Sequence, residues 1–146
     1  MGRFLDMRVS ENSSTFGSPG TAVTTTPALF GVIGLQTQNV AGTGTNGLIV
    51  DLIGTIGLSN TGASTVTINI QRGATTVFGS GVIIYTAEAH FEGNETRLIT
   101  VNSVDLTAPA AAQTEYTIFI RGTGTVTRTG PESFSGIAQN GLAPTP

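Results

Sequence analysis

Alternation of apolar and polar residues dominates the chain from residue 29 onward, and it limits the fold more than any other feature. The clearest case is residues 66–71, where Val66, Ile68 and Ile70 are each followed by a polar residue. A period of two is typical of a β-strand with one buried face. Glycines interrupt every long stretch, and no window has the apolar spacing of an amphipathic helix over three turns. We therefore expect an all-β protein.

About eight alternating segments follow one another between turn-forming residues. This pattern predicts a single jelly-roll-like β-sandwich over residues 29–140, long enough to bury its own core. The expected strands lie at residues 29–40, 48–58, 66–71, 77–85, 96–106, 116–121, 125–128 and 133–139.

The two ends of the chain differ from this pattern. Residues 1–28 are expected to form an N-terminal connector, made of a short strand-like piece and a flexible linker over residues 10–26 rich in Ser, Thr, Gly and Pro. Residues 141–146 are expected to be an irregular tail. An apolar strand on a polar tether suggests an arm that binds something, so its candidate interface residues are Arg3, Phe4, Leu5, Met7 and Val9.

The composition argues for close packing of identical copies. Only 10% of the residues are charged, the net charge is −3, all six basic residues are Arg, and there are 25 Thr and 20 Gly. The scattered Arg residues form no basic patch, so neither nucleic acid nor membrane is an expected partner. A surface poor in charge favours association. The chain has no Cys, which excludes disulfides and thiolate metal sites.

Candidate catalytic residues are few. His90, the one His, lies between Glu88 and Glu92, and alternation could place the three on one face as a base or metal site. A polar loop between strands, over residues 86–94, is the simpler interpretation. Asp51 and Asp105 are each expected to pair with an Arg across a sheet. The G-x-G-x-x-G pattern at residues 42–47 opens a strand, so we interpret it as a turn. We expect no enzyme activity, no cofactor and no metal.

Two sequences suggest a family. Residues 52–59, LIGTIGLS, and residues 130–138, GPESFSGIA, together with the strands between them, resemble the exosporium protein C type of spore-surface proteins of bacilli. In architecture the chain also resembles the jelly-roll subunits of endospore appendage fibres, although without Cys it cannot form their disulfides. The resemblance implies a location on the spore surface, in exosporium or appendage, and a possible anchor protein there. No secretory signal is visible at the N-terminus, which suits synthesis in a cytosol followed by lysis.

Several functions stay open at this point. The first is a structural subunit of a fibre or pilus, a homopolymer in which the N-terminal strand inserts into a neighbouring copy. The second is an exosporium or coat module that forms closed trimers or a lattice. A lectin-like binding module and a phage decoration protein are further alternatives.

Overall fold

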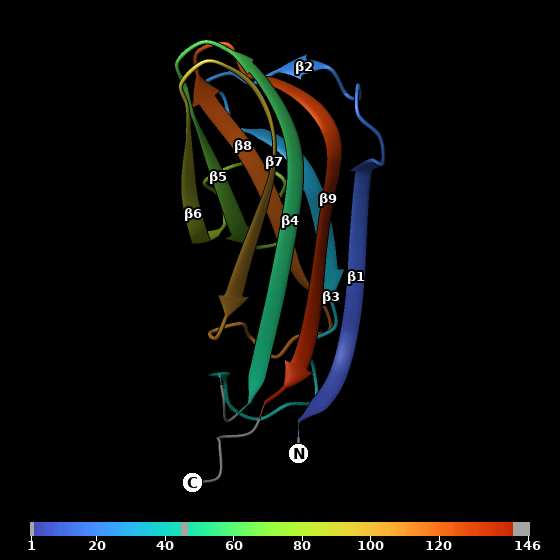
Figure 1. Ribbon diagram of the computed structural model, residues 1–146. Coiled ribbons are helices and arrows are strands. Elements are labelled where there is room, and N and C mark those ends of the chain that lie inside the picture. The colour runs from blue at the N-terminus through green and yellow to red at the C-terminus, as the bar shows by residue number, and fades with distance from the viewer. Residues whose placement is uncertain (1, 45–46, 142–146) are drawn as a thin grey trace, which may run out of the picture.

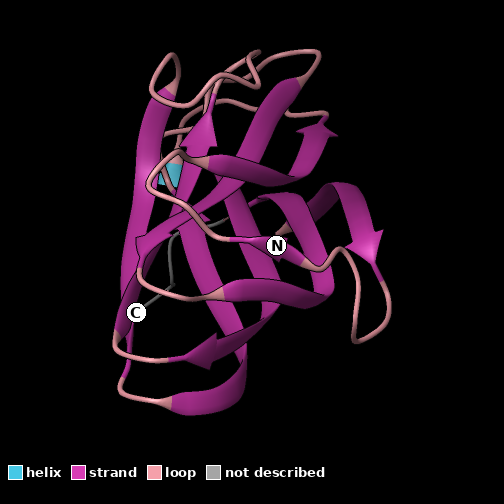
Figure 2. Ribbon diagram, turned by 90° about the horizontal axis from the view of Figure 1, so that it is seen from above, coloured by secondary structure: helices cyan, strands magenta, loops and turns pink. Residues whose placement is uncertain are grey.

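Two antiparallel β-sheets stack face to face in the computed structural model, which describes residues 2–44 and 47–141 (Figures 1 and 2). The first sheet has the strand order β1-β9-β4-β7, and the short β2 pairs with β9. The second sheet has the order β3-β8-β5-β6. The strands are β1 (Arg3–Ser13), β2 (Thr21–Ala22), β3 (Ala28–Leu35), β4 (Leu48–Thr61), β5 (Ser64–Arg72), β6 (Val82–Phe91), β7 (Asn94–Asp105), β8 (Thr114–Thr123) and β9 (Thr127–Asn140).

This strand order is that of a jelly roll. Without the two-residue β2, successive strands lie in opposite sheets except for β5 and β6, which form a hairpin in the second sheet, and the first strand lies beside the last. Large apolar side chains from both sheets fill the space between them, and the bulkiest that are fully buried include Tyr116, Phe91 and Phe134. The predicted all-β, jelly-roll-like sandwich is confirmed.

The structure differs from the predicted strands in three places. The strand expected at residues 77–85 is β6, and it extends through the segment 86–91 that was expected to be a loop, because Ala87, Ala89 and Phe91 supply the inward face. Residues 73–81 instead form a loop, which Gln71 holds by bonds to the Val77 carbonyl and the Gly79 amide.

The other two differences concern β3 and β9. The strand expected to reach residue 40 ends at Leu35. The two expected C-terminal strands are one, since β9 runs through Pro131. The proline falls where the pairing with β4 shifts between Ile56 and Leu58, and proline is tolerated at such irregularities. Residues 45–46 of the predicted turn and 142–146 of the predicted tail lie outside the described residues.

Candidate assembly surface

The predicted arm forms β1, the edge strand of the first sheet. It pairs antiparallel with β9 of the same chain along its whole length, from Arg3 opposite Asn140 to Ser13 opposite Glu132 (Figure 1). Ser10–Ser13 therefore continues the strand, and Thr21–Ala22 forms β2, so the expected flexible linker over residues 10–26 is shorter than predicted. In the single chain, β1 completes the first sheet.

The five predicted interface residues fall into three groups. Phe4, Met7 and Val9 are 64%, 51% and 70% exposed, on the outer face of the sheet. Leu5, at a register shift, is half-buried and packs against the core. Arg3 donates a hydrogen bond from Nη2 to the Asn39 carbonyl at 3.1 Å. The expectation that docking buries the apolar side chains of the arm thus holds for Leu5 alone in this position.

Polar side chains instead connect β1 to the neighbouring edge of β3. The Gln36 amide donates to Asp6 Oδ2 at 2.9 Å, and the Val32 amide donates to Ser10 Oγ at 3.4 Å. Burial raises the pKa of Asp6, but the Gln36 amide and Arg8 outweigh it and hold that pKa below its ordinary value. Two open hollows of about 200 and 260 Å³ lie along this seam, so β1 and β3 are not tightly packed.

A buried ion pair lies beneath the end of β1. Glu132 is fully buried, and its carboxylate receives two hydrogen bonds of 2.7 Å each from Nε and Nη2 of Arg128. Asn12 Nδ2 donates a third bond, of 2.6 Å, to Oε1. A buried carboxylate is tolerated only when it is paired and hydrogen-bonded, and β1 supplies one of its three hydrogen bonds.

Apolar side chains continue from β1 across the outer face of the first sheet. Met7 lies opposite Ile137 of β9, which is followed across the sheet by Asp51 and Val104. Ile53 and Val104 are 43% and 49% exposed. Neighbouring side chains on one face of a sheet are in reach of each other, so these residues and Phe4 and Val9 form one surface. We call Phe4, Met7, Val9, Ile53, Val104 and Ile137 the outer apolar face.

The residues examined for catalysis are dispersed or structural. His90 is exposed on β6, and its Nδ1 lies 3.0 Å from Thr65 Oγ1. Among residues 2–44 and 47–141, no cluster of His, Asp and Glu could hold a metal ion. Asp51 pairs with Asn102 rather than with an Arg.

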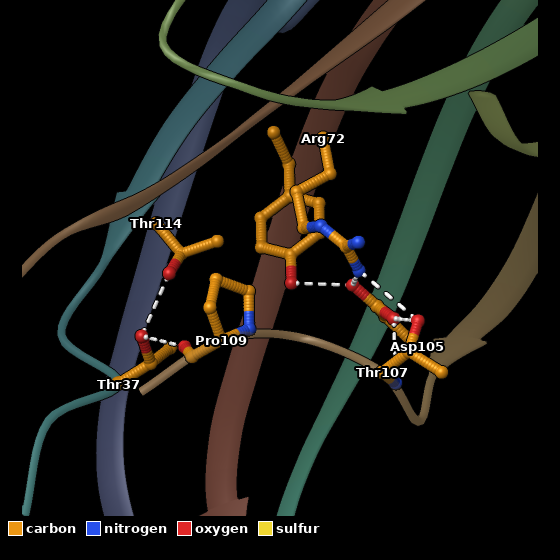
Figure 3. Close-up of polar contacts among 7 residues, drawn as sticks. Thr37, Arg72, Asp105, Thr107, Pro109 and Thr114 are labelled. Carbon is orange, nitrogen blue, oxygen red and sulfur yellow. Dashed lines mark hydrogen bonds and ion pairs between the residues drawn. The ribbon is translucent and has the colours of Figure 1, made fainter. Parts of the chain in front are cut away.

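Asp105 does pair with an Arg, at the end of the sandwich shown in Figure 3. Its Oδ2 accepts hydrogen bonds from Arg72 Nη1 at 2.6 Å and Tyr116 Oη at 2.9 Å, and Oδ1 accepts one from the Thr107 amide at 2.9 Å. Burial raises the pKa of Asp105, but these donors outweigh it and lower that pKa below its ordinary value. Burial and the Asp105 charge raise the pKa of Tyr116 far above its usual range.

This network ties β5, β7 and β8 together, so its role is structural. Nearby, Thr37 Oγ1 lies 2.7 Å from Thr114 Oγ1 and donates to the Pro109 carbonyl at 2.8 Å, which fixes the connection between β7 and β8 (Figure 3). The sequence predicted an Arg partner for Asp105 but not Tyr116 or Thr107.

Asp6, Ser10 and Asn12 were also missed as contact residues, because the apolar residues of the arm drew the prediction. A signal was present: residues 6, 8, 10 and 12 are all polar, and alternate residues of a strand lie on one face.

In the described part of the chain, no helix is long and apolar enough to cross a membrane. No protein-family model matches the sequence. No curated protein matches it either, so the resemblance to the exosporium protein C type stays a prediction.

Solved structures that match the chain include the tumour necrosis factor Eiger from S. frugiperda, with 13% identity and a TM-score of 0.43 over 100% of this chain and 96% of that one. A subunit of Bacillus endospore appendages, described as disulfide-linked pili, has 14% identity and a TM-score of 0.27, over 98% of this chain and 92% of that one. Dimeric latent PorU from Porphyromonas gingivalis has 10% identity and a TM-score of 0.45; the match covers 96% of this chain but spans only 13% of PorU. The function must therefore be inferred from the residues of this chain.

Proposed function

We propose that this chain is a non-enzymatic structural subunit that assembles with copies of itself by exchanging β1. The strand of one copy leaves its own sheet and pairs with β9 of the next copy in the register seen here. The observation that carries the proposal is the position of β1: it is an edge strand paired with β9 alone, and it leaves three large apolar side chains exposed.

Exchange costs little contact energy because it replaces each contact with the same contact. The β1–β9 ladder, the Leu5 packing and the Asn12–Glu132 bond can all form equally well between two copies. An exchanged strand makes a heterologous, head-to-tail contact, and such a contact grows into a filament when it does not close. We place that filament on a spore surface, as the resemblance to spore proteins implies.

The segment between β1 and β2, residues 14–20, is the hinge for exchange. Seven extended residues reach about 25 Å at most. In the single chain it is held by two backbone bonds, from the Gly17 amide to the Thr129 carbonyl and from the Gly20 amide to the Arg128 carbonyl. Opening those bonds frees β1 while β2 stays in place, so neighbouring copies must lie close together.

Disulfide trapping tests this proposal directly, because the chain has no Cys of its own that could form other disulfides. Val9 and Ser135 are Cα partners on β1 and β9. Paired positions in antiparallel strands lie about 4.5–5.5 Å apart, within the range of a disulfide. The double variant Val9→Cys/Ser135→Cys is assembled, oxidised and run on a denaturing gel without reductant.

Exchange predicts a ladder of covalent multimers. A band at monomer mass alone would show that each β1 stays in its own sheet and would overturn the proposal. The matched control is Thr55→Cys/Thr100→Cys on β4 and β7, whose Oγ1 atoms lie 3.2 Å apart. This pair should cross-link within one chain under both hypotheses.

The outer apolar face favours a second candidate, a closed oligomer or lattice in which copies pack face to face. Electron microscopy of the purified protein separates the two, because exchange gives fibres and face packing gives discrete particles or sheets. The six residues of the outer apolar face are uncharged, although Asp51 lies between Ile137 and Val104, so most of this surface suits packing of identical copies. Neither candidate requires a catalytic residue, a cofactor or a metal.

A further inference from the structure

The side of β1 that faces β3 carries an ordered series of hydrogen-bonding groups. Asp6 accepts from the Gln36 amide, Ser10 accepts from the Val32 amide, and Asn12 donates to Glu132. Arg8, a donor only, stands between the two acceptors. We call the position that β1 occupies, beside β9 and the edge of β3, the β1 slot.

We infer that Asp6, Arg8, Ser10 and Asn12 form a register code that makes the β1 slot selective for β1 of this same protein. The inference rests on the proposed exchange and names the residues that would direct it. Apolar burial gives β1 little selectivity, since Leu5 is the large apolar side chain of β1 that packs against the core.

A slip by two residues preserves which side chains face β3, so it is the error that pairing alone would permit. Asp6 and Ser10 lie against Gln36 and Val32 with β1 and β3 running in opposite directions. A slip in one direction moves Arg8 to the Gln36 amide, and a slip in the other moves it to the Val32 amide. Each slip therefore sets a donor against a donor and leaves that amide without an acceptor.

The ion pair adds a second check at the end of the strand. Glu132 is fully buried and already holds Arg128, so the slot offers an acceptor oxygen to an incoming side chain. The Asn12 amide donates to it, whereas an acidic side chain there would bring two negative charges together. Hydrogen bonds to a charged group are stronger than neutral ones, so the bonds at Asn12 and Asp6 are more selective than the longer, neutral bond at Ser10.

The test reads the register of exchanged strands directly. A strand copy carries Val9→Cys, and it is mixed with one of three slot copies that carry Ser133→Cys, Ser135→Cys or Ile137→Cys. These positions are the partner of Val9 in register and its partners after a slip by two residues in either direction. Isotope labelling of one copy identifies disulfide-linked peptides between chains by mass spectrometry.

We expect the unaltered strand to link to position 135 at least about tenfold more than to 133 or 137, since a lost charged hydrogen bond alone is a change of that order. In the triple variant Asp6→Ala/Ser10→Ala/Asn12→Ala, linkage at position 135 should fall. Most of the preference for position 135 over positions 133 and 137 should be lost. Asn12→Asp should lower linkage at 135, whereas Asn94→Asp, which makes the same change at an exposed position of β7, should not.

Two results would distinguish a failure of the register code from a failure of strand exchange. Linkage at 135 that is unchanged in the triple variant would refute the register code and leave exchange intact. No linkage between chains for the unaltered strand would refute exchange itself. Leu5→Ala is the control for apolar contacts, and an equal loss of the preference for position 135 in that variant would show that burial, not the polar series, selects the strand.

Discussion

The guanidinium of Arg128 donates two hydrogen bonds to the carboxylate of Glu132, four residues further along β9, inside the sandwich. The pair is nearly inaccessible to water, with Glu132 fully buried and Arg128 8% exposed. Its location under the end of β1 makes it part of the candidate assembly surface as well as of the fold.

Breaking this pair on one side should be more damaging than removing both partners. Glu132→Gln leaves a buried guanidinium without its carboxylate, and we expect a loss of about 3–5 kcal/mol in the free energy of unfolding. Arg128→Met/Glu132→Leu removes both charges and should lose much less. Urea unfolding of the three proteins, followed by circular dichroism, measures the difference. Equal losses in the single and double variants would contradict the prediction.

Asp105 should make the stability of the protein depend on pH in the acid range. The pKa of Asp105 is lowered in the folded state, so the unfolded chain binds the proton more readily. The stabilisation that ionised Asp105 provides is therefore present above the unfolded pKa of about 3.9 and is lost as pH falls below it. Asp105→Asn should reduce the steepness of that loss between about pH 5 and pH 2. Thermal melts at a series of pH values provide the measurement. The Asp51→Asn variant is the control, and a slope unchanged by Asp105→Asn would contradict the prediction.

Gly57 should not accept a side chain. A Cβ there would overlap the Gly130 carbonyl oxygen, a backbone atom that cannot turn away. Gly57→Ala should therefore destabilise the fold by at least about 1–3 kcal/mol, the usual range for overpacking. Gly93→Ala, where nothing lies within 4 Å of the new Cβ, should change stability little. The difference in melting temperature between the two variants tests this, and a tolerated Gly57→Ala would contradict it.

The sequence was sufficient for the fold class because alternation is a local property. The alternation at residues 66–71 predicted β5, and the expected end at Gln71 lies one residue before the observed end. Whether a side chain of such a strand faces the core or solvent can be judged from its immediate neighbours in the sequence. The error at residues 86–91 has a physical reason: Ala87 and Ala89 are small, so their alternation with polar residues is weak in the sequence although they pack against the core.

The candidate site was less predictable because it depends on contacts between distant segments. The sequence indicated that β1 is a binding strand, but it could not show that Glu132, 120 residues after Asn12, is its polar partner. Nor could it show that Met7 and Val9 face outward while Leu5 packs inward, since a register shift between Phe4 and Asp6 decides that orientation.

His90 should be dispensable. It is exposed, and its side-chain hydrogen bond is a surface contact with Thr65. His90→Ala should change the free energy of unfolding by less than about 0.5 kcal/mol, as surface substitutions usually do, and should leave assembly unchanged. Elemental analysis of both proteins is the further check. Stoichiometric metal in the unaltered protein that is lost in the variant would overturn the structural interpretation of this residue.

Leu5 and Met7 should respond differently to the same substitution. Leu5 is the large apolar side chain of β1 that packs against the core, so Leu5→Asp places a charge at a half-buried apolar contact. Docking of β1 should lose about 1–3 kcal/mol, part of it the lost apolar contact. We expect this variant to give folded monomers in size-exclusion chromatography, with β1 detached.

Met7 is 51% exposed on the outer apolar face, so Met7→Asp adds a charge without disturbing the docking of β1. If copies are joined by strand exchange, Met7→Asp still forms fibres and still gives the disulfide ladder in the Val9→Cys/Ser135→Cys background. If copies are joined face to face through the outer apolar face, Met7→Asp abolishes assembly and Leu5→Asp does not. The two variants carry the same new charge two positions apart, so the contrast between them reports which surface of β1 makes the contact.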